Sequence, residues 1–196
     1  MADAQICNMA LGHAGYGTAP ISDLDTDKTA EARICRVFYE QARKMCLEAY
    51  DWGFARRRET LSLHGTAPPS TWAYRYAYPA TCLAPRSIPQ PGADYPSQRY
   101  KIETLATGEK TILTNAGEAE LIFTADLQES GPYTAWFKHV FSILLGHFIA
   151  RPTTGRRDIK NDLWQLYAHA IAVAPAHEAN QEKDPEEQDA SWITVR

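Results

Sequence analysis

Two histidines have a spacing that first suggests metal chemistry. His139 and His147 lie eight residues apart in a segment with helical periodicity. That spacing puts them near one face of a helix but separates them by about 12 Å along its axis, too far to bind one ion. We therefore interpret both as surface or partly buried histidines. The sequence predicts no metal site and no cofactor.

The motifs of common catalytic and nucleotide-binding sites are missing. The sequence has no P-loop, no glycine-rich dinucleotide fingerprint, no nucleophile elbow and no HExxH. Its four cysteines (Cys7, Cys35, Cys46 and Cys82) lack the close spacing of a zinc knuckle or a redox pair. We interpret them as small buried hydrophobic residues in a reducing compartment. The chain is predicted to have no catalytic residues and not to be an enzyme.

Arginines are concentrated at two places in the sequence. The clusters are Arg56, Arg57 and Arg58, and then Arg156 with Arg157. Compact positive patches can contact phosphates or an acidic protein surface. They can equally remain solvated and pair with nearby acids such as Glu59 and Asp158. Two interpretations stay open for these arginines, a subunit interface and an ordinary exposed surface.

The end of the chain combines an acidic stretch with apolar residues. Residues 178–189 hold six acids and one lysine, which is typical of a polar helix extension or a flexible linker. Trp192, Ile193 and Val195 follow, and the chain closes on Arg196. Exposed apolar residues at a chain end usually need a partner surface, although fraying is the simple alternative. We expect these four residues to bind a partner.

Composition narrows the class of protein. The 196 residues are 44% hydrophobic and 22% charged, which is typical of one globular domain with an insertion. The formal net charge of -4 argues against a surface devoted to nucleic acid or an anionic membrane. No apolar run is long enough to span a membrane, and the first residues lack the features of a secretory signal.

Four segments show helical periodicity. They are residues 4–12, 26–50, 131 to the break at Pro152, and 158–174. In the longest, one predicted core-facing stripe comprises Ala30, Ile34, Val37, Phe38, Gln41 and Met45, widened by Cys35, Ala42 and Cys46. Arg43 falls on the opposite, charged face. After this helix, the segment from Arg56 to Leu63 is predicted to be a short helix or an extended arm.

The centre of the sequence has a different composition and a different hydrophobic pattern. Residues 65–98 are rich in proline, which excludes a long helix, and residues 74–78 alternate as in a strand. Three more strands are predicted at 99–105, 111–114 and 118–125, forming one small antiparallel sheet.

The predicted fold class is α+β, mainly α: a helical bundle with a small antiparallel β insertion and an extended C-terminal tail. We divide the chain into bundle parts at 1–64 and 131–177, the proline-rich and β insertion at 65–130, and the linker and tail at 178–196.

Several of these segments, taken in order, resemble the tail tubular protein A and head-to-tail adaptor family of tailed bacteriophages. The resemblance is carried by residues 4–12, 20–25, Ala30, Ala32, Cys35, Tyr39, Glu40, Arg43, Leu47, 52–55, Leu61, Pro69, Trp72, Tyr74, Tyr76 and 79–83. It is specific over residues 4–88 and continues more loosely to residue 175. The turn Ala80-Thr81-Cys82 departs from it, since an aspartate is expected beside the cysteine, and residues 178–196 have no match.

The resemblance implies a structural virion protein at the head–tail junction, assembled in the host cytoplasm without a membrane. It implies a dodecameric ring of this chain between the portal protein and a tail or nozzle protein. The ring would enclose a channel through which genomic DNA passes without specific binding. The alternative is a small helical DNA-binding module that uses the arginine clusters. Salt-dependent DNA binding would favour the module, and a large ring or portal binding would favour the adaptor.

Overall fold

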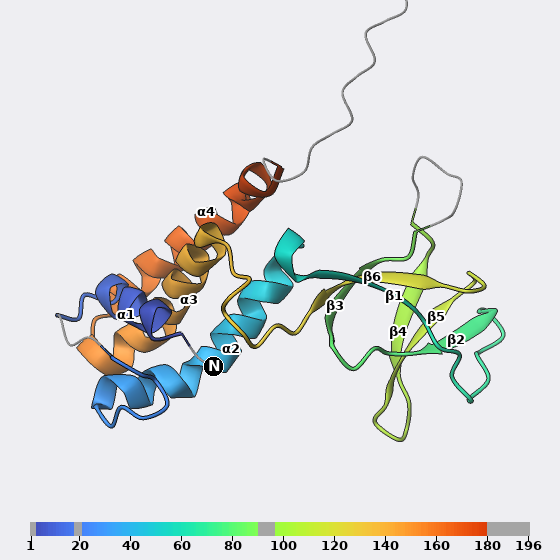
Figure 1. The fold of residues 1–196 in the computed structure, drawn as a ribbon, viewed down its shortest axis with the longest axis horizontal. Helices are drawn as coiled ribbons and strands as arrows, with labels where there is room; N and C mark the ends of the chain where they lie inside the picture. The colour runs from blue at the N-terminus through green and yellow to red at the C-terminus, as the bar shows by residue number, and fades with distance from the viewer. Residues whose placement is uncertain (1–2, 18–20, 90–96, 180–196) are drawn as a thin grey trace, which may run out of the picture.

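Helices and strands occupy separate halves of the molecule in the computed structural model, which describes residues 3–17, 21–89 and 97–179 (Figure 1). The helices are α1 (Ala4–His13), α2 (Ala30–Ala49), α3 (Ala135–Thr154) and α4 (Arg157–Ala179). The strands are β1 (Arg56–Thr60), β2 (Tyr74–Ala77), β3 (Cys82–Ser87), β4 (Tyr100–Thr104), β5 (Lys110–Thr114) and β6 (Glu120–Ala125). The α+β class predicted from the sequence is confirmed. No helix among these residues is long and apolar enough to cross a membrane.

Capping side chains set the helix boundaries. Thr29 accepts a hydrogen bond from Ala32 N, so α2 begins at Ala30, four residues after the predicted start. Thr134 caps α3 through Phe137 N in the same way. Gly155, with φ 72°, adopts the left-handed conformation that ends α3. Pro152 lies within the last turn of α3 instead of ending it.

The core of the bundle is built around α3. This helix packs against α1, α2 and α4, and it runs between α2 and α4 (Figure 1). Residues 140–146 of α3 are all buried. Trp52, which follows α2, is also fully buried and contacts Phe137 edge-on at 5.1 Å between ring centroids. The bundle therefore has one continuous apolar core that includes the aromatic residues after α2.

The face that α2 turns to this core agrees with the predicted one at Cys35, Ala42 and Cys46 and differs from it elsewhere. The buried stripe comprises Ala32, Cys35, Tyr39, Ala42, Arg43, Cys46 and Leu47. Val37 is 71% exposed, and Ile34, Phe38 and Met45 are only partly buried. Both stripes recur at three- and four-residue steps, so periodicity alone did not separate them. Arg43, predicted on the solvent face, is fully buried.

The strands form two antiparallel sheets instead of the single sheet predicted. Their strand orders are β1-β6-β3 and β2-β5-β4. Of the three predicted neighbours, β4 and β5 do pair, but β6 lies in the other sheet. The chain crosses between the sheets after β5, where Glu118 has a positive φ of 50°. Strand positions depend on local pattern, whereas strand pairing depends on contacts across the fold.

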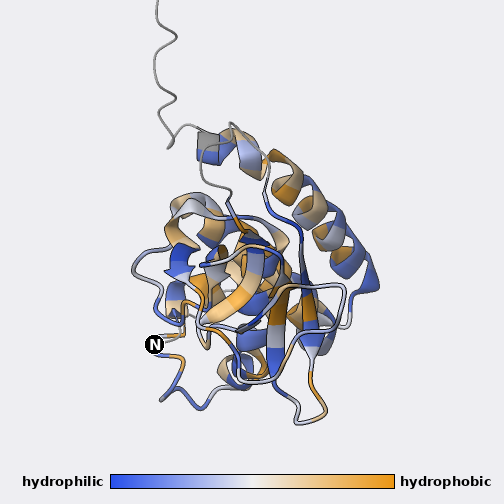
Figure 2. Cartoon of the chain, turned by 90° about the vertical axis from the view of Figure 1, so that its right-hand side faces the viewer, coloured by the Kyte–Doolittle hydropathy of each residue, from blue (hydrophilic) through white to orange (hydrophobic). Residues whose placement is uncertain are grey.

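The two sheets share a small apolar core of their own. Tyr76 and Ile112 from one sheet pack with Leu121 and Phe123 from the other, and all four are buried. The strands carry both hydrophobic and hydrophilic residues (Figure 2). The β part is therefore a packed unit with a separate hydrophobic core.

The β part begins earlier in the chain than the predicted insertion. A short turn of 3₁₀ helix, η1 (Gly53–Ala55), leads directly into β1. Of the two predictions for this segment, a short helix and an extended arm, the extended conformation is found, and it pairs as a strand in a sheet. At the other end, Glu178 is a buried part of α4, because its Oε2 accepts a hydrogen bond from Gly53 N at 2.9 Å. The helix continues through Pro175 to Ala179.

Candidate assembly interface

The first arginine cluster lies on β1, at one edge of its sheet. Arg56, Arg57 and Arg58 are all exposed. Arg56 forms an ion pair with Asp51, and Arg58 forms one with Glu120 on β6, each at 3.2 Å. Exposed pairs of this kind contribute at most about 1 kcal/mol to stability. The cluster is accessible to a partner, but nearby acids partly neutralise its charge.

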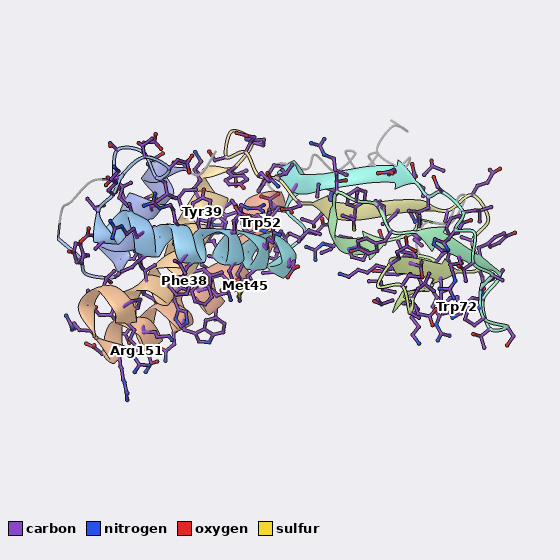
Figure 3. All side chains as sticks on the ribbon, turned by 90° about the horizontal axis from the view of Figure 1, so that it is seen from below. Phe38, Tyr39, Met45, Trp52, Trp72 and Arg151 are labelled. Carbon is purple, nitrogen blue, oxygen red and sulfur yellow. The ribbon has the colours of Figure 1, made fainter. Side chains whose placement is uncertain are left out.

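The second arginine cluster lies at the turn from α3 to α4. Arg156 holds Asp158 through two hydrogen bonds, the shorter at 2.6 Å, and this contact lowers the pKa of the Asp158 carboxyl. Arg157 is exposed at the start of α4, and Arg151 is exposed in the last turns of α3. This end of the bundle is basic and faces away from the sheets (Figure 3).

The structure does not bring the two arginine clusters together. The hydrogen bond between Glu178 and Gly53 fixes the end of α4 beside η1, and β1 starts directly after η1. Arg157 is 21 residues from Glu178 on the same helix. At a rise of 1.5 Å per residue, that is a separation of about 32 Å. The two clusters therefore do not form one continuous basic surface.

The partner-binding residues expected near the C-terminus, Trp192, Ile193, Val195 and Arg196, lie outside the described residues. The same holds for all of the acidic linker after Ala179.

The histidines make contacts that explain their positions without a ligand. His147 Nδ1 lies 2.9 Å from the carbonyl oxygen of Lys160. His139 contacts His13 edge-on at 5.9 Å between ring centroids. Burial, followed by the neighbouring His139, lowers the pKa of His13. Within the described ranges, no three histidine, cysteine or acidic side chains are grouped so that they could hold a metal ion. The four cysteines are buried and unpaired.

A surface rich in aromatic residues, of which the α2 stripe was predicted to face the core, runs across three helices. On α2 it comprises the half-buried or exposed stripe of Ile34, Val37, Phe38 and Met45; on α3, His147 and Phe148; and on α4, Trp164. We call this surface the open face.

Contacts between rings connect its three helices. Phe38 stacks on Phe148 with 5.8 Å between centroids, and His147 lies 5.2 Å from Trp164. A shallow depression of about 540 Å³ opens beside Trp164 and is lined by His147, Lys160, Asn161 and Gln165. Phe38 and Met45 lie on the side of α2 that borders α3 and α4 (Figure 3).

Two further arginines, neither of them identified from the sequence as functional, hold the bundle and the β part together. Arg43 donates to Leu127 O at 2.6 Å and forms ion pairs with Asp126 at 2.7 Å and Glu40 at 2.8 Å. Arg86 on β3 donates to three carbonyl oxygens at the end of α2, the shortest contact being 2.6 Å to Tyr50 O. We call these two arginines and their partners the joint.

The geometry thus offers two surfaces for assembly and no catalytic constellation among the described residues. One is the open face with the basic α3–α4 turn at its end, and the other is the arginine-bearing edge of β1. Compared with protein-family models and with curated proteins, the chain matches none of them.

Proposed function

We propose that this chain is a structural virion protein of a tailed bacteriophage, a head-to-tail adaptor. In this proposal, twelve copies form a ring between the portal protein and a tail or nozzle protein, at the head–tail junction. The ring encloses the channel for genomic DNA and assembles in the host cytoplasm. It has no catalytic role and needs no cofactor.

The observation that carries the proposal is the structural role of the residues that resemble the adaptor family. Asn8 Nδ2 donates to Ile21 O at 2.9 Å, and Asn8 Oδ1 accepts from Ile21 N at 2.8 Å. The indole of Trp52 donates to Cys46 O at 2.9 Å. The first two contacts join the segments at 4–12 and 21–25, and the third fixes the segment at 52–55 to the end of α2. The residues shared with the family are thus framework residues, which is what a structural protein requires.

The joint also supports this proposal, because it contains another residue of the family resemblance. Arg43 is one of the residues in the resemblance, and it fixes the bundle to the chain that leaves the β part. A residue that sets the relation between two parts of a subunit is needed where both parts must meet neighbours in a ring.

The charge distribution is compatible with a channel that lets DNA pass. The net charge is -4, and at least three of the five clustered arginines contact acids. Such a surface attracts phosphates weakly, which favours passage over retention. In the assembled ring, the clustered arginines Arg56, Arg57, Arg58, Arg156 and Arg157 would lie at subunit contacts.

The proposal is tested by mixing the purified protein with the purified portal protein of the same phage. We expect the two to co-elute as one large complex in size-exclusion chromatography. The DNA-binding alternative is tested in parallel by titrating the protein alone against a short duplex at about 50 and 200 mM salt. Saturable, salt-dependent DNA binding without portal binding would contradict the adaptor and favour the alternative.

A further inference from the structure

The open face is an apolar helix surface that the other described elements cover only in part, since Ile34, Phe38, Met45 and Phe148 are half-buried against the edge of the core. Gly146 of α3 faces α1, since a Cβ placed there would lie 3.1 Å from Ala10 O. Phe148 is two residues farther along, about 200° around the helix, and therefore faces away from α1 toward Phe38. On this side, Val37 is 71% exposed and Trp164 is 47% exposed. Exposed apolar surface of this extent across three helices is typical of an interaction site.

One end of the open face is basic. Arg151, Arg157 and Lys160 lie at the α3–α4 turn and in the first turn of α4. The ion pairs of the described residues include none of these three side chains. A ligand for this face should therefore carry negative charge at one end and large apolar side chains at the other.

The C-terminal sequence of this chain has that chemistry in that order. Five acids come first: Glu182, Asp184, Glu186, Glu187 and Asp189. Trp192, Ile193 and Val195 follow. We propose that the open face binds residues 182–196 of a second copy of this chain. The inference rests on the proposed function only for closure into a ring of twelve, and the contact between two copies does not depend on it.

The distance between charged and aromatic residues is similar on the open face and in the C-terminal segment. Arg157 and Trp164 are seven residues apart on α4, which corresponds to about 10 Å along the helix. Asp189 and Trp192 are three residues apart, which spans about 10 Å in an extended chain. A segment that enters at the α3–α4 turn thus brings its acids to the arginines and its tryptophan to Trp164.

The same order argues for a neighbour's segment instead of the chain's own. Helix α4 ends at Ala179, at the opposite end of the open face from the arginines. A segment returning from there would pass its acids over the apolar end of the face and bring Arg196 toward Arg151. The chain's own segment reaches the basic end only when residues 180–189 are fully extended along the whole of α4, whereas a segment from another copy can enter there directly. Because the segment and the face are different surfaces, the contact is head-to-tail and can close a ring.

The test is self-association of the full chain, measured by sedimentation velocity across a concentration series. We expect the wild type to self-associate, and Trp164→Ala and Trp192→Ala each to weaken this at least about thirtyfold, as for an interface tryptophan. Leu166→Ala is the matched control, since Leu166 is 42% exposed on the other flank of the same helix. It should associate like the wild type. Added salt should weaken association of the wild type.

Mixing the two tryptophan variants gives the sharpest outcome. Trp164→Ala keeps an intact C-terminal segment, and Trp192→Ala keeps an intact open face. An equimolar mixture should therefore form a complex of one copy of each, whereas either variant alone stays monomeric. A mixture that stays monomeric, or a Trp164→Ala variant that associates like the wild type, would overturn the inference.

Further measurements distinguish the contact between two copies from binding of the segment within its own chain, and from the adaptor proposal. Hydrogen exchange on α2 and α4 in monomeric wild type, compared with Trp192→Ala, detects a segment bound within its own chain. Protection lost in that variant would overturn the contact between copies. Self-association as described without portal binding would leave this contact standing and defeat the adaptor proposal. Portal binding without segment-dependent self-association would do the reverse.

Discussion

The helical bundle and the β part bury their apolar side chains in different ways. The bundle buries one continuous core around α3, and the surplus of its apolar surface emerges as the open face. The β part has a smaller core between two three-stranded sheets and leaves strand edges exposed. Between them, Arg43 and Arg86 add charged hydrogen bonds to backbone carbonyls beside the apolar contacts of Leu83 and Leu127. The comparison indicates that the bundle is stabilised mainly by packing, whereas buried polar contacts contribute much of what holds the two halves together.

Removing Arg43 should have the largest effect on stability. Arg43→Ala removes the buried ion-pair partner of Asp126 and one of the two donors to Leu127 O, which keeps its hydrogen bond from Tyr133, and it leaves a cavity where a fully buried side chain lay. Together these losses should lower the free energy of unfolding by about 3–5 kcal/mol. Urea unfolding measures this change. Lys44→Ala is the control, because Lys44 is half exposed and contacts the same Asp126 at 3.8 Å. Equal effects of both substitutions would show that burial at the joint is not decisive.

A cavity in the small core of the β part should have the second-largest effect on stability. Ile112→Ala removes a fully buried side chain from between the sheets and should lower the free energy of unfolding by about 2–5 kcal/mol. Hydrogen exchange should show lost protection in the strands with little change in α3. The matched control is Ile102→Ala, since Ile102 pairs with Ile112 across β4 and β5 but is 40% exposed. Equal loss of protection in α3 would mean that the two halves unfold as one unit.

A smaller effect is expected for Arg86. Arg86→Ala removes charged hydrogen bonds to the end of α2, which should cost about 1.5–3 kcal/mol. Arg58→Ala removes only an exposed pair with Glu120 from the same sheet and should change stability by less than about 1 kcal/mol. Thermal unfolding of the two variants distinguishes a joint residue from a surface one. Reversed sizes would contradict the role given to Arg86.

The smallest expected effect is the pH dependence of stability that arises from His13 in the bundle. Burial lowers the pKa of His13 below its ordinary value of 6.5, so the unfolded chain takes up this proton more readily than the folded chain. Stability is therefore complete above about pH 6.5 and falls as the pH drops through the folded pKa, by at most about 1.4 kcal/mol per unit. His13→Gln should reduce this slope, measured by urea unfolding between pH 5 and 7. His169→Gln, at an exposed position of α4, should leave it unchanged.

Features that depend on local chemistry could be predicted from the sequence. Helical periodicity located the four helices to within five residues at each end, and the strands predicted at 74–78, 99–105, 111–114 and 118–125 correspond to β2, β4, β5 and β6. Pairing could not be predicted, because β6 finds its neighbours β1 and β3 from distant parts of the chain. Tertiary contacts, not local pattern, decide such partners.

The open face and the joint were missed for a related reason. Helix α2 carries two apolar stripes, and only the packing of α3 shows that the stripe with Tyr39 is buried and the stripe with Val37 is not. Arg43 looked like a solvent-facing residue, because its partners Asp126 and Leu127 lie more than eighty residues away. The clustered arginines were easier to find in the sequence, yet the structure gives them only exposed positions.

The most direct test of the adaptor account is the mass of the complex that this protein forms with its portal. Native mass spectrometry should show about 264 kDa added to the portal, which is twelve copies of the 22.0 kDa chain. The same complex carrying Trp192→Ala should lose most of that mass at equal concentration. A portal that gains no mass, or that gains a few independent copies instead of twelve, would contradict the account.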